Sequence, residues 1–232
     1  MDNPYSYQDS LHLLNNSEWN KLSLENRAAV MQSVENETAR REGRPPCNVS
    51  LFSEPPNAKG MINAGKYHPD NGSIGVNAYH LQGNPAGCLN TVLHEGRHDY
   101  QEKAVKGEIY HHDKAELKAW RENMKPGHYI DGKKNPRAYY RQPIEADAHK
   151  YAEITTGQIL AEQKIQNNTN KGISSFAAKS VVPGDPAASA NKGIQSFRDR
   201  VNRAEIGSAS NAPNTAKSES SGRSSGSGGQ NR

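Results

Sequence analysis

The chain is poor in cysteine and has no long apolar run. Its 232 residues include two cysteines, Cys47 and Cys88, which are too few for a disulfide framework. We expect both to be buried thiols, with a single bridge between them, or Cys88 as an inhibitory metal ligand, as the alternatives. No apolar stretch approaches the roughly 18 to 20 residues of a membrane-spanning helix, so the sequence predicts a soluble protein.

A signal peptide and a strong charge of one sign are also missing. The first ten residues, MDNPYSYQDS, lack the charged and apolar regions of a secretory signal. We therefore expect a cytoplasmic protein, or one secreted without a classical signal peptide. The net charge is +4 at pH 7 and the basic residues form no long run, so we expect neither nucleic acid nor a membrane surface as a partner.

Composition divides the chain into four parts. We expect an N-terminal segment, a folded domain, a linker and a disordered Ser/Gly-rich tail at residues 1–22, 23–166, 167–205 and 206–232. In the linker, NKGISSF at residues 170 to 176 recurs as NKGIQSF at residues 191 to 197. Two copies are too few for a stacked solenoid, so we interpret them as paired motifs or a duplicated helical segment that could bind a partner.

Helix and strand patterns follow one another in the order of an α+β domain. Ser23 can cap a helix over residues 24 to 42, and Gly43 with two following prolines ends it. The segments after it alternate apolar and polar residues, as strands do, with a hairpin turn at residues 69 to 72. The sequence thus predicts a small N-terminal helix and a short β-sheet. Further helices are expected at residues 85 to 105, 115 to 123 and 143 to 165.

The stretch TVLHEGRHDYQ, residues 91 to 101, carries the main chemical signal. On a helix, His94 and His98 lie one turn apart on the same face, so both imidazoles can bind one metal ion. Glu95 then projects close to that ion without binding it, where it can take a proton from a metal-bound water. This His-Glu-x-x-His pattern predicts a zinc site with two ligands and a general base on one helix.

A zinc ion of this type needs a third protein ligand. Metzincins place a glycine and a third histidine three and six residues after the second histidine, where this chain has Gln101 and Ala104, so that class is excluded. The remaining candidate is a glutamate from a later helix, and QPIEADAHKYA provides Glu145. His149, one turn further along the same face, is also a good zinc ligand and is therefore the alternative.

The hairpin, TVLHEGRHDYQ and YYRQPIEADAHKYA together resemble a known group of enzymes, the minimal gluzincin metallopeptidases. These are small zinc-dependent proteases found among bacterial stand-alone peptidases, phage proteins and toxin or effector modules. The resemblance covers residues 20 to 165. It implies a zincin-like fold and one Zn²⁺ bound by His94, His98 and Glu145, with Glu95 as the general base.

Two supporting roles are less well defined by the sequence. Many gluzincins have an aspartate four residues after the ligand glutamate, where it supports a ligand histidine. This chain has His149 there, so Asp147 or Asp99 is the candidate for that hydrogen bond. Hydrolysis also forms an oxyanion that needs a donor besides zinc, and Tyr139 and Tyr140 are the candidates for this catalytic role.

Three functions are compatible with these residues. The first is a zinc endopeptidase whose protein or peptide substrate adds as a strand along residues 72 to 79. The second is a binding module with a structural or vestigial zinc site, in which the repeated NKGI segments dock a partner. The third keeps the same site and hydrolyses a non-protein amide such as a cell-wall peptide. Glu95 favours an enzyme, since a structural zinc site normally lacks a neighbouring base.

Overall fold

The computed structural model describes the backbone of residues 3 to 179 and the side chains of residues 3 to 169. The chain divides into two compact units, Met1–Ile173 and Ser174–Arg232. The fold below belongs to the first unit, and the described residues of the second form the end of one helix. The second NKGI segment and the Ser/Gly-rich tail lie outside the described residues.

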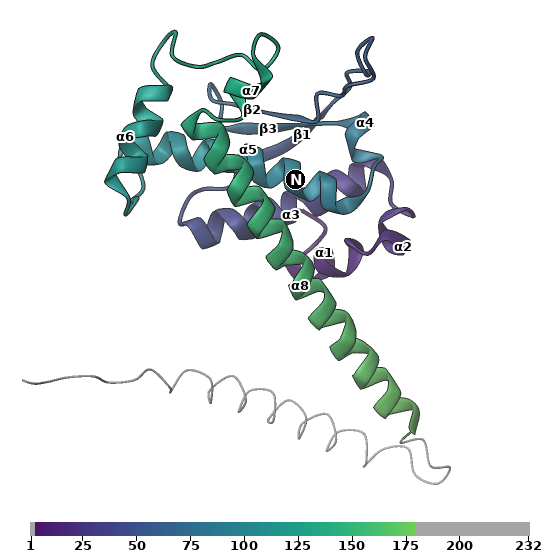
Figure 1. The fold of residues 1–232 in the computed structure, drawn as a ribbon. Coiled ribbons are helices and arrows are strands. Elements are labelled where there is room, and N and C mark those ends of the chain that lie inside the picture. Colours follow the sequence, from purple (N-terminus) through teal and green to yellow (C-terminus); the bar gives the residue numbers. More distant parts are fainter. Residues whose placement is uncertain (1–2, 180–232) are drawn as a thin grey trace, which may run out of the picture. The chain divides into compact units, whose positions relative to one another are not determined.

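Helices and a small sheet make this an α+β protein (Figure 1). The order along the chain is α1 (Tyr7–Leu13), α2 (Asn16–Trp19), α3 (Leu24–Glu42), β1 (Asn48–Phe52), β2 (Gly65–His68), β3 (Ser73–Asn77), α4 (Ala78–Leu81), α5 (Pro85–Lys106), α6 (Lys114–Asn123), α7 (Pro136–Tyr139) and α8 (Pro143–Lys179). Among the described residues, no helix is long and apolar enough to cross a membrane.

Local capping signals explain where the two central helices begin and end. The Ser23 side chain accepts a hydrogen bond from the backbone N–H of Asn26, and Gly43 ends α3 with a φ of 70°. Asn84 caps α5 in the same way, and Gly107 ends it with a φ of 79°. Both helices therefore match the sequence prediction to within one residue. Helix α8 differs, because it continues beyond the predicted end at residue 165 to Lys179.

The three-stranded sheet has the order β1-β3-β2. Strand β3 pairs with β1 in parallel and with β2 in antiparallel fashion. The strand predicted to receive a substrate, at residues 72 to 79, is therefore the central strand, and its backbone groups are already used on both sides. Within the described residues the edge strands are β1 and β2, so only these can accept a further strand.

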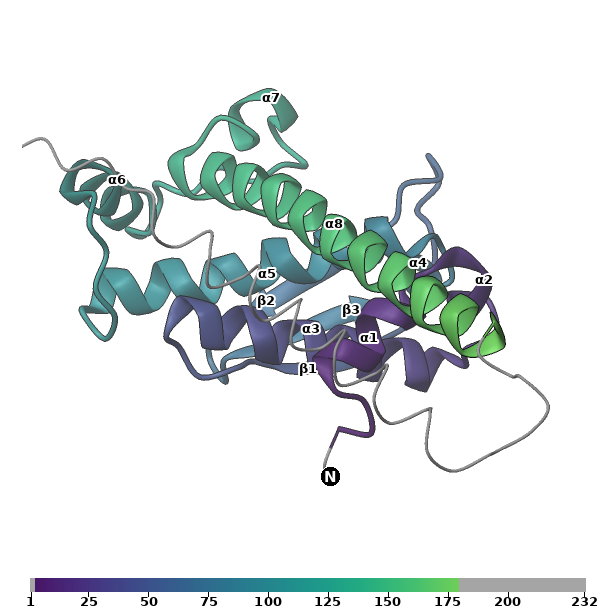
Figure 2. The same cartoon turned by 90° about the horizontal axis from the view of Figure 1, so that it is seen from below.

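The described residues form two apolar cores, a larger one around the sheet and a smaller one of Ala104, Trp120 and Ile144 from α5, α6 and α8. Helix α3 contacts β1 and α5, and α5 contacts β2 and β3, so the two helices cover one face of the sheet (Figure 2). The larger core includes Trp19, Val30, Met31, Val34, Ile74, Val76, Leu89, Val92, Leu93, Ala152 and Ile159. Cys47 and Cys88 are buried free thiols, as predicted, and burial raises the pKa of both.

Candidate metal centre

Two helices bring the three predicted metal ligands together. His94 and His98 project from the middle of α5, and Glu145 lies in the first turn of α8. The Nε2 atoms of His94 and His98 are 3.1 Å apart. Glu145 Oε2 lies 3.2 Å from His94 Nε2, and Glu145 Oε1 lies 3.6 Å from His98 Nε2. The structure thus places the three predicted ligands around one point.

Their spacing matches that of metal ligands. With metal–ligand bonds of about 2.0–2.2 Å and tetrahedral angles, ligand atoms lie about 3.3–3.5 Å from one another. The three separations, 3.1, 3.2 and 3.6 Å, scatter around this value. The two distances to Glu145 end at different carboxylate oxygens, Oε2 and Oε1, so the three side chains surround a space in which they could hold a metal ion.

His149 forms a second group of possible metal ligands with two of these residues. Ligand atoms of His94, Glu145 and His149 lie within 4.8 Å of one another. The His149 ring packs between His94, with ring centroids 4.4 Å apart, and Tyr140, with centroids 4.9 Å apart. His149 is absent from the lining of the cavity that reaches the other ligands. The cavity lining favours His98 over His149 as the partner of His94 and Glu145, because His98 lines the cavity and His149 does not.

Glu145 is buried and ionised. Its side chain sits among the ligand histidines and is almost fully shielded from water, with the residue 1% exposed. Burial by itself would raise its pKa, but the hydrogen bond with His94 and the electrostatic influence of His98 outweigh burial and lower the pKa to about 2. The Tyr129 hydroxyl donates a further hydrogen bond of 2.8 Å to Glu145 Oε1. A carboxylate held in this form is ready to bind a cation.

Glu95 lies in the same cavity as Glu145, but its pKa is shifted in the opposite direction. Removal from water raises its pKa to about 7, and the nearby charge of Glu145 adds to this effect. His98 and the backbone of Tyr67 act in the opposite direction. A carboxylate that titrates near neutrality can both accept and release a proton at physiological pH. Glu95 therefore has the properties of a general base.

The cavity around these groups has a volume of about 650 Å³. Its lining consists of Gly65, Lys66, Tyr67, Pro69, His94, Glu95, His98, Glu102, Met124, Tyr129, Tyr139, Ile144 and Glu145. Strand β2 forms one wall, and it lies very close to α5. A Cβ on Gly65 would lie 2.5 Å from Thr91 Cγ2 and 3.3 Å from Glu95 Cγ. Only glycine at this position lets the edge strand approach the base so closely.

The two residues between Glu95 and His98 face other helices. Gly96 lies against the ion pair of Glu35 and Arg44, where a Cβ would be 2.7 Å from Glu35 Oε2 and 2.9 Å from Arg44 Nη2. Arg97 donates two hydrogen bonds, of 2.8 and 3.2 Å, to Asp147 on α8. It donates another of 3.1 Å to Glu42 at the end of α3. Arg97 thus fixes α5, the helix that carries the His-Glu-x-x-His motif, to both α3 and α8.

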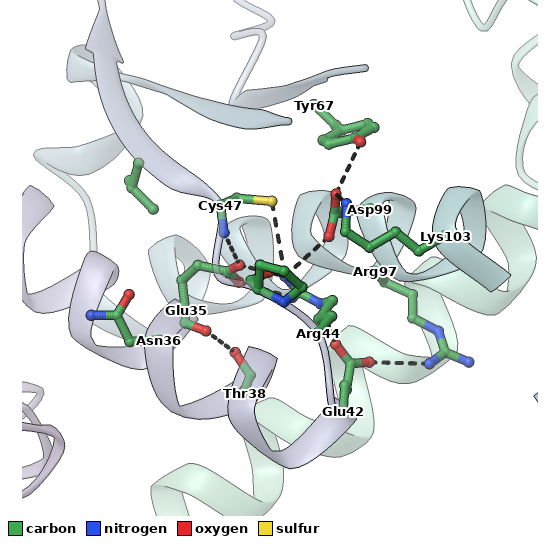
Figure 3. Close-up of polar contacts among 12 residues, drawn as sticks. Glu35, Asn36, Thr38, Glu42, Arg44, Cys47, Tyr67, Arg97, Asp99 and Lys103 are labelled. Carbon is green, nitrogen blue, oxygen red and sulfur yellow. Dashed lines mark hydrogen bonds and ion pairs between the residues drawn. The ribbon is translucent and has the colours of Figure 1, made fainter. Parts of the chain in front are cut away.

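A cluster of buried charges lies beneath the motif helix (Figure 3). Arg44 donates to Glu35 at 2.6 Å and to Asp99 at 3.4 Å, and the three side chains are 1%, 0% and 1% exposed. The backbone N–H of Cys47 donates to the same Glu35 carboxylate at 2.8 Å. Tyr67 donates to Asp99 from the other side at 3.1 Å. Each buried charge therefore has a partner, which buried charges require.

The predicted supporting roles fall on different residues. Asp99 binds Arg44, Tyr67 and Lys103, and Asp147 binds Arg97 and Gln101, so neither carboxylate is engaged with His94 or His98. Gln101 makes that contact instead, with its Oε1 atom 2.9 Å from His98 Nδ1. The spacing of three residues on a helix was the available sequence signal, because it places both side chains on one face.

The tyrosines near the site also differ from one another. Tyr139 lines the cavity, and its ring centroid lies 6.2 Å from that of Tyr129. Burial, together with the hydrogen bond and charge of Glu145, raises the pKa of Tyr139. Tyr140 is 58% exposed and lies outside the cavity lining, against His149. Tyr129 comes from an irregular loop, and no sequence pattern distinguishes it.

Comparison of the chain with protein-family models, with curated proteins and with solved structures finds no match to any of them.

Proposed function

We propose that the protein is a zinc-dependent metallopeptidase with a gluzincin-type site in a zincin-like fold. The observation that carries this proposal is the convergence of His94, His98 and Glu145, at separations of 3.1 to 3.6 Å, beside Glu95 in one cavity. The combination of three ligands, an open fourth position and a neighbouring base is what metal-assisted hydrolysis needs.

The donor set supports zinc over the common oxygen-loving cations. Two imidazole nitrogens and one carboxylate oxygen suit Zn²⁺, whereas Mg²⁺ and Ca²⁺ prefer sites built from oxygen atoms alone. A zinc ion held here would lower the pKa of a bound water toward neutrality and polarise a substrate carbonyl. His94, His98 and Glu145 would hold it.

The chain's own groups supply the proton transfers. Glu95 takes the proton from the attacking water and returns it to the amine that leaves when the peptide bond breaks. Removal from water raises the pKa of Glu95, which favours its uptake of the proton. Tyr129 and Tyr139 present hydroxyl groups to the same cavity, where either can donate a hydrogen bond to the oxyanion. Tyr139 keeps the role predicted from the sequence, and Tyr129 joins it as a second candidate.

The edge strand supports a peptide substrate. Gly65, Lys66 and Tyr67 of β2 line the cavity, and β3 pairs with β2 on one side only. An extended peptide can add to the other side through backbone hydrogen bonds, which places its carbonyl groups near Glu95. This role moves the expected substrate-binding strand from residues 72 to 79 to β2.

The test compares Glu95→Gln with Glu108→Gln, a matched change at an exposed position just beyond α5. We expect Glu95→Gln to keep nearly one equivalent of zinc and to lose at least about a hundredfold of hydrolysis, because it removes only the proton acceptor. Casein, peptide pools and cell-wall peptides serve as substrates, so that peptidase activity is separated from hydrolysis of a non-protein amide. Unchanged turnover in Glu95→Gln, or a wild type that binds no zinc, would contradict the proposal.

The alternative function, a binding module that uses the NKGI segments, depends on residues 170 to 176 and 191 to 197. Their side chains lie outside the described residues, so this alternative stays a prediction. It requires a metal site without catalytic activity. Zinc binding in the wild type without hydrolysis of any of the three substrate types would favour it.

A further inference from the structure

Gln101 is a fully buried polar side chain with a complete set of hydrogen-bond partners. It lies on α5, three residues after His98, and is 0% exposed. Its Nε2 atom donates to the backbone oxygen of Ile144 at 2.9 Å and to Asp147 Oδ2 at 2.7 Å. Its Oε1 atom lies 2.9 Å from His98 Nδ1. The Gln101 side chain therefore contacts His98 on α5 and two residues of α8, Ile144 and Asp147, that lie on either side of Glu145 in the sequence.

The partners determine which way the Gln101 amide points. A backbone carbonyl and a carboxylate only accept hydrogen bonds, so the group between them must be the NH₂ of Gln101. The oxygen of the amide then faces His98, and because this oxygen only accepts, His98 Nδ1 must carry the hydrogen. In the neutral imidazole, His98 Nε2 is then left with a free lone pair, and this atom points toward His94 and Glu145.

The Asp147 carboxylate is held in place by Arg97. Arg97 binds both of its carboxylate oxygens, at 2.8 and 3.2 Å, and also binds Glu42 at 3.1 Å. The Arg97 guanidinium lies over the rings of Tyr100 and Tyr151, 4.1 and 4.7 Å from their centroids. Rotation of Asp147 would therefore break several contacts at once. This leaves Gln101 with a fixed acceptor rather than a mobile one.

We propose that Gln101 is a positioning residue that sets the tautomer of His98 and locks α5 to the first turn of α8. Through its three contacts, one side chain fixes the orientation of His98 and the distance between the two helices that carry the ligands. The role in metal binding rests on the proposed function. The tautomer of His98 does not, because it follows from the hydrogen bonds that Gln101 makes with Ile144, Asp147 and His98.

The experiment replaces Gln101 with methionine, which has a similar length but accepts no strong hydrogen bond. Gln163→Met is the matched control, because Gln163 is also a buried glutamine on a long helix but lies away from the ligands. Imidazole ¹H–¹⁵N correlation spectra at about pH 8, where histidine is neutral, report the tautomer of His98 in each metal-free protein. Competition with a chelator reports the dissociation constant for Zn²⁺.

We expect the wild type and Gln163→Met to carry the hydrogen on Nδ1 of His98, and Gln101→Met to show a mixture of tautomers. We expect Gln101→Met to bind zinc about ten- to a hundredfold more weakly than either, the usual loss when the partner of a ligand histidine is removed. A wild-type His98 with its hydrogen on Nε2, or zinc affinity of Gln101→Met within about twofold of wild type, would overturn the proposal.

The two readouts separate this inference from the proposed function. If the wild type binds no zinc, the metallopeptidase fails and the tautomer alone decides the role of Gln101. If Gln101→Met does not fold, the wild-type tautomer still gives the answer, since that measurement needs no variant.

Discussion

Gly96 lies between His94 and His98 in the sequence. Its replacement by alanine adds one carbon atom and so tests how closely α5 packs against the residues beneath it. A Cβ there would lie 2.7 Å from Glu35 Oε2 and 2.9 Å from Arg44 Nη2. Both atoms belong to an ion pair whose side chains are 0% and 1% exposed. Glu35 also accepts a hydrogen bond from the backbone of Cys47. Its carboxylate therefore cannot move aside without losing partners that it needs.

Two opposing effects determine how much Gly96→Ala changes the free energy of unfolding. Replacing a helical glycine by alanine normally stabilises a protein by about 1 kcal/mol. Overpacking costs about 1–3 kcal/mol, and complete loss of a buried ion-pair partner costs about 3–5 kcal/mol. For overpacking with partial loosening of the pair, we expect Gly96→Ala to lower the free energy of unfolding by about 2 kcal/mol. Gly157 on α8, with nothing within 4 Å of its Cβ, is the matched control, and Gly157→Ala should raise it by about 1 kcal/mol.

Urea and thermal unfolding of the two variants, followed by far-ultraviolet circular dichroism, measure this difference. A separation of about 3 kcal/mol corresponds to roughly 6–12 °C between their melting temperatures in a domain of this size. If Gly96→Ala were as stable as Gly157→Ala, the ion pair would not lie against α5 as closely as described. Glu35 and Arg44 would then not require a glycine at position 96.

Two further predictions concern the ligands and the acid stability. Glu145→Ala should lose most of its zinc at neutral pH and His149→Ala should keep it, as measured by metal analysis; the reverse result would assign the metal to three histidines. Arg41 holds the pKa of Glu162 below 4.5, so their pair stabilises the fold above about pH 4.5 and this contribution is lost as the pH falls through the lowered value. Glu162→Gln should therefore weaken the fall of the unfolding free energy in acid, and an acid limb identical to that of the wild type would rule this out.

The sequence predicts those parts of the fold that depend on neighbouring residues. Ser23 and Gly107 are a cap and a stop that act within one helical turn, so the ends of α3 and α5 can be read without the structure. The predicted end of α8, at residue 165, is wrong because the polar residues that follow it do not end the helix. A polar side chain does not break backbone hydrogen bonds, and no proline interrupts the helix before Lys179.

The sequence predicts the positions of those site residues that depend on helical spacing, but not of those that depend on tertiary packing. Two ligands lie one turn apart, so their pairing is local. Gln101 could also have been found, because a residue three places after His98 shares its face, whereas Asp99 is rotated by about 100°. Tyr129 is different, because its contact with Glu145 depends on the path of a loop that no local pattern fixes. The burial of Arg44 likewise depends on contacts with Glu35 and Asp99.

The burial of the proposed metal ligands argues against an accidental match to the motif. An accidental histidine pair on a polar helix would face water, but His94 is 8% exposed and Glu145 is 1% exposed. His94 Nδ1 and His149 Nε2 are also buried without a hydrogen-bond partner in the described part of the chain. Burying polar groups without full pairing destabilises a fold, by about 1–3 kcal/mol for each unsatisfied group. Apolar side chains would fill the same space without this cost, so the presence of the polar set fits the proposed metal site.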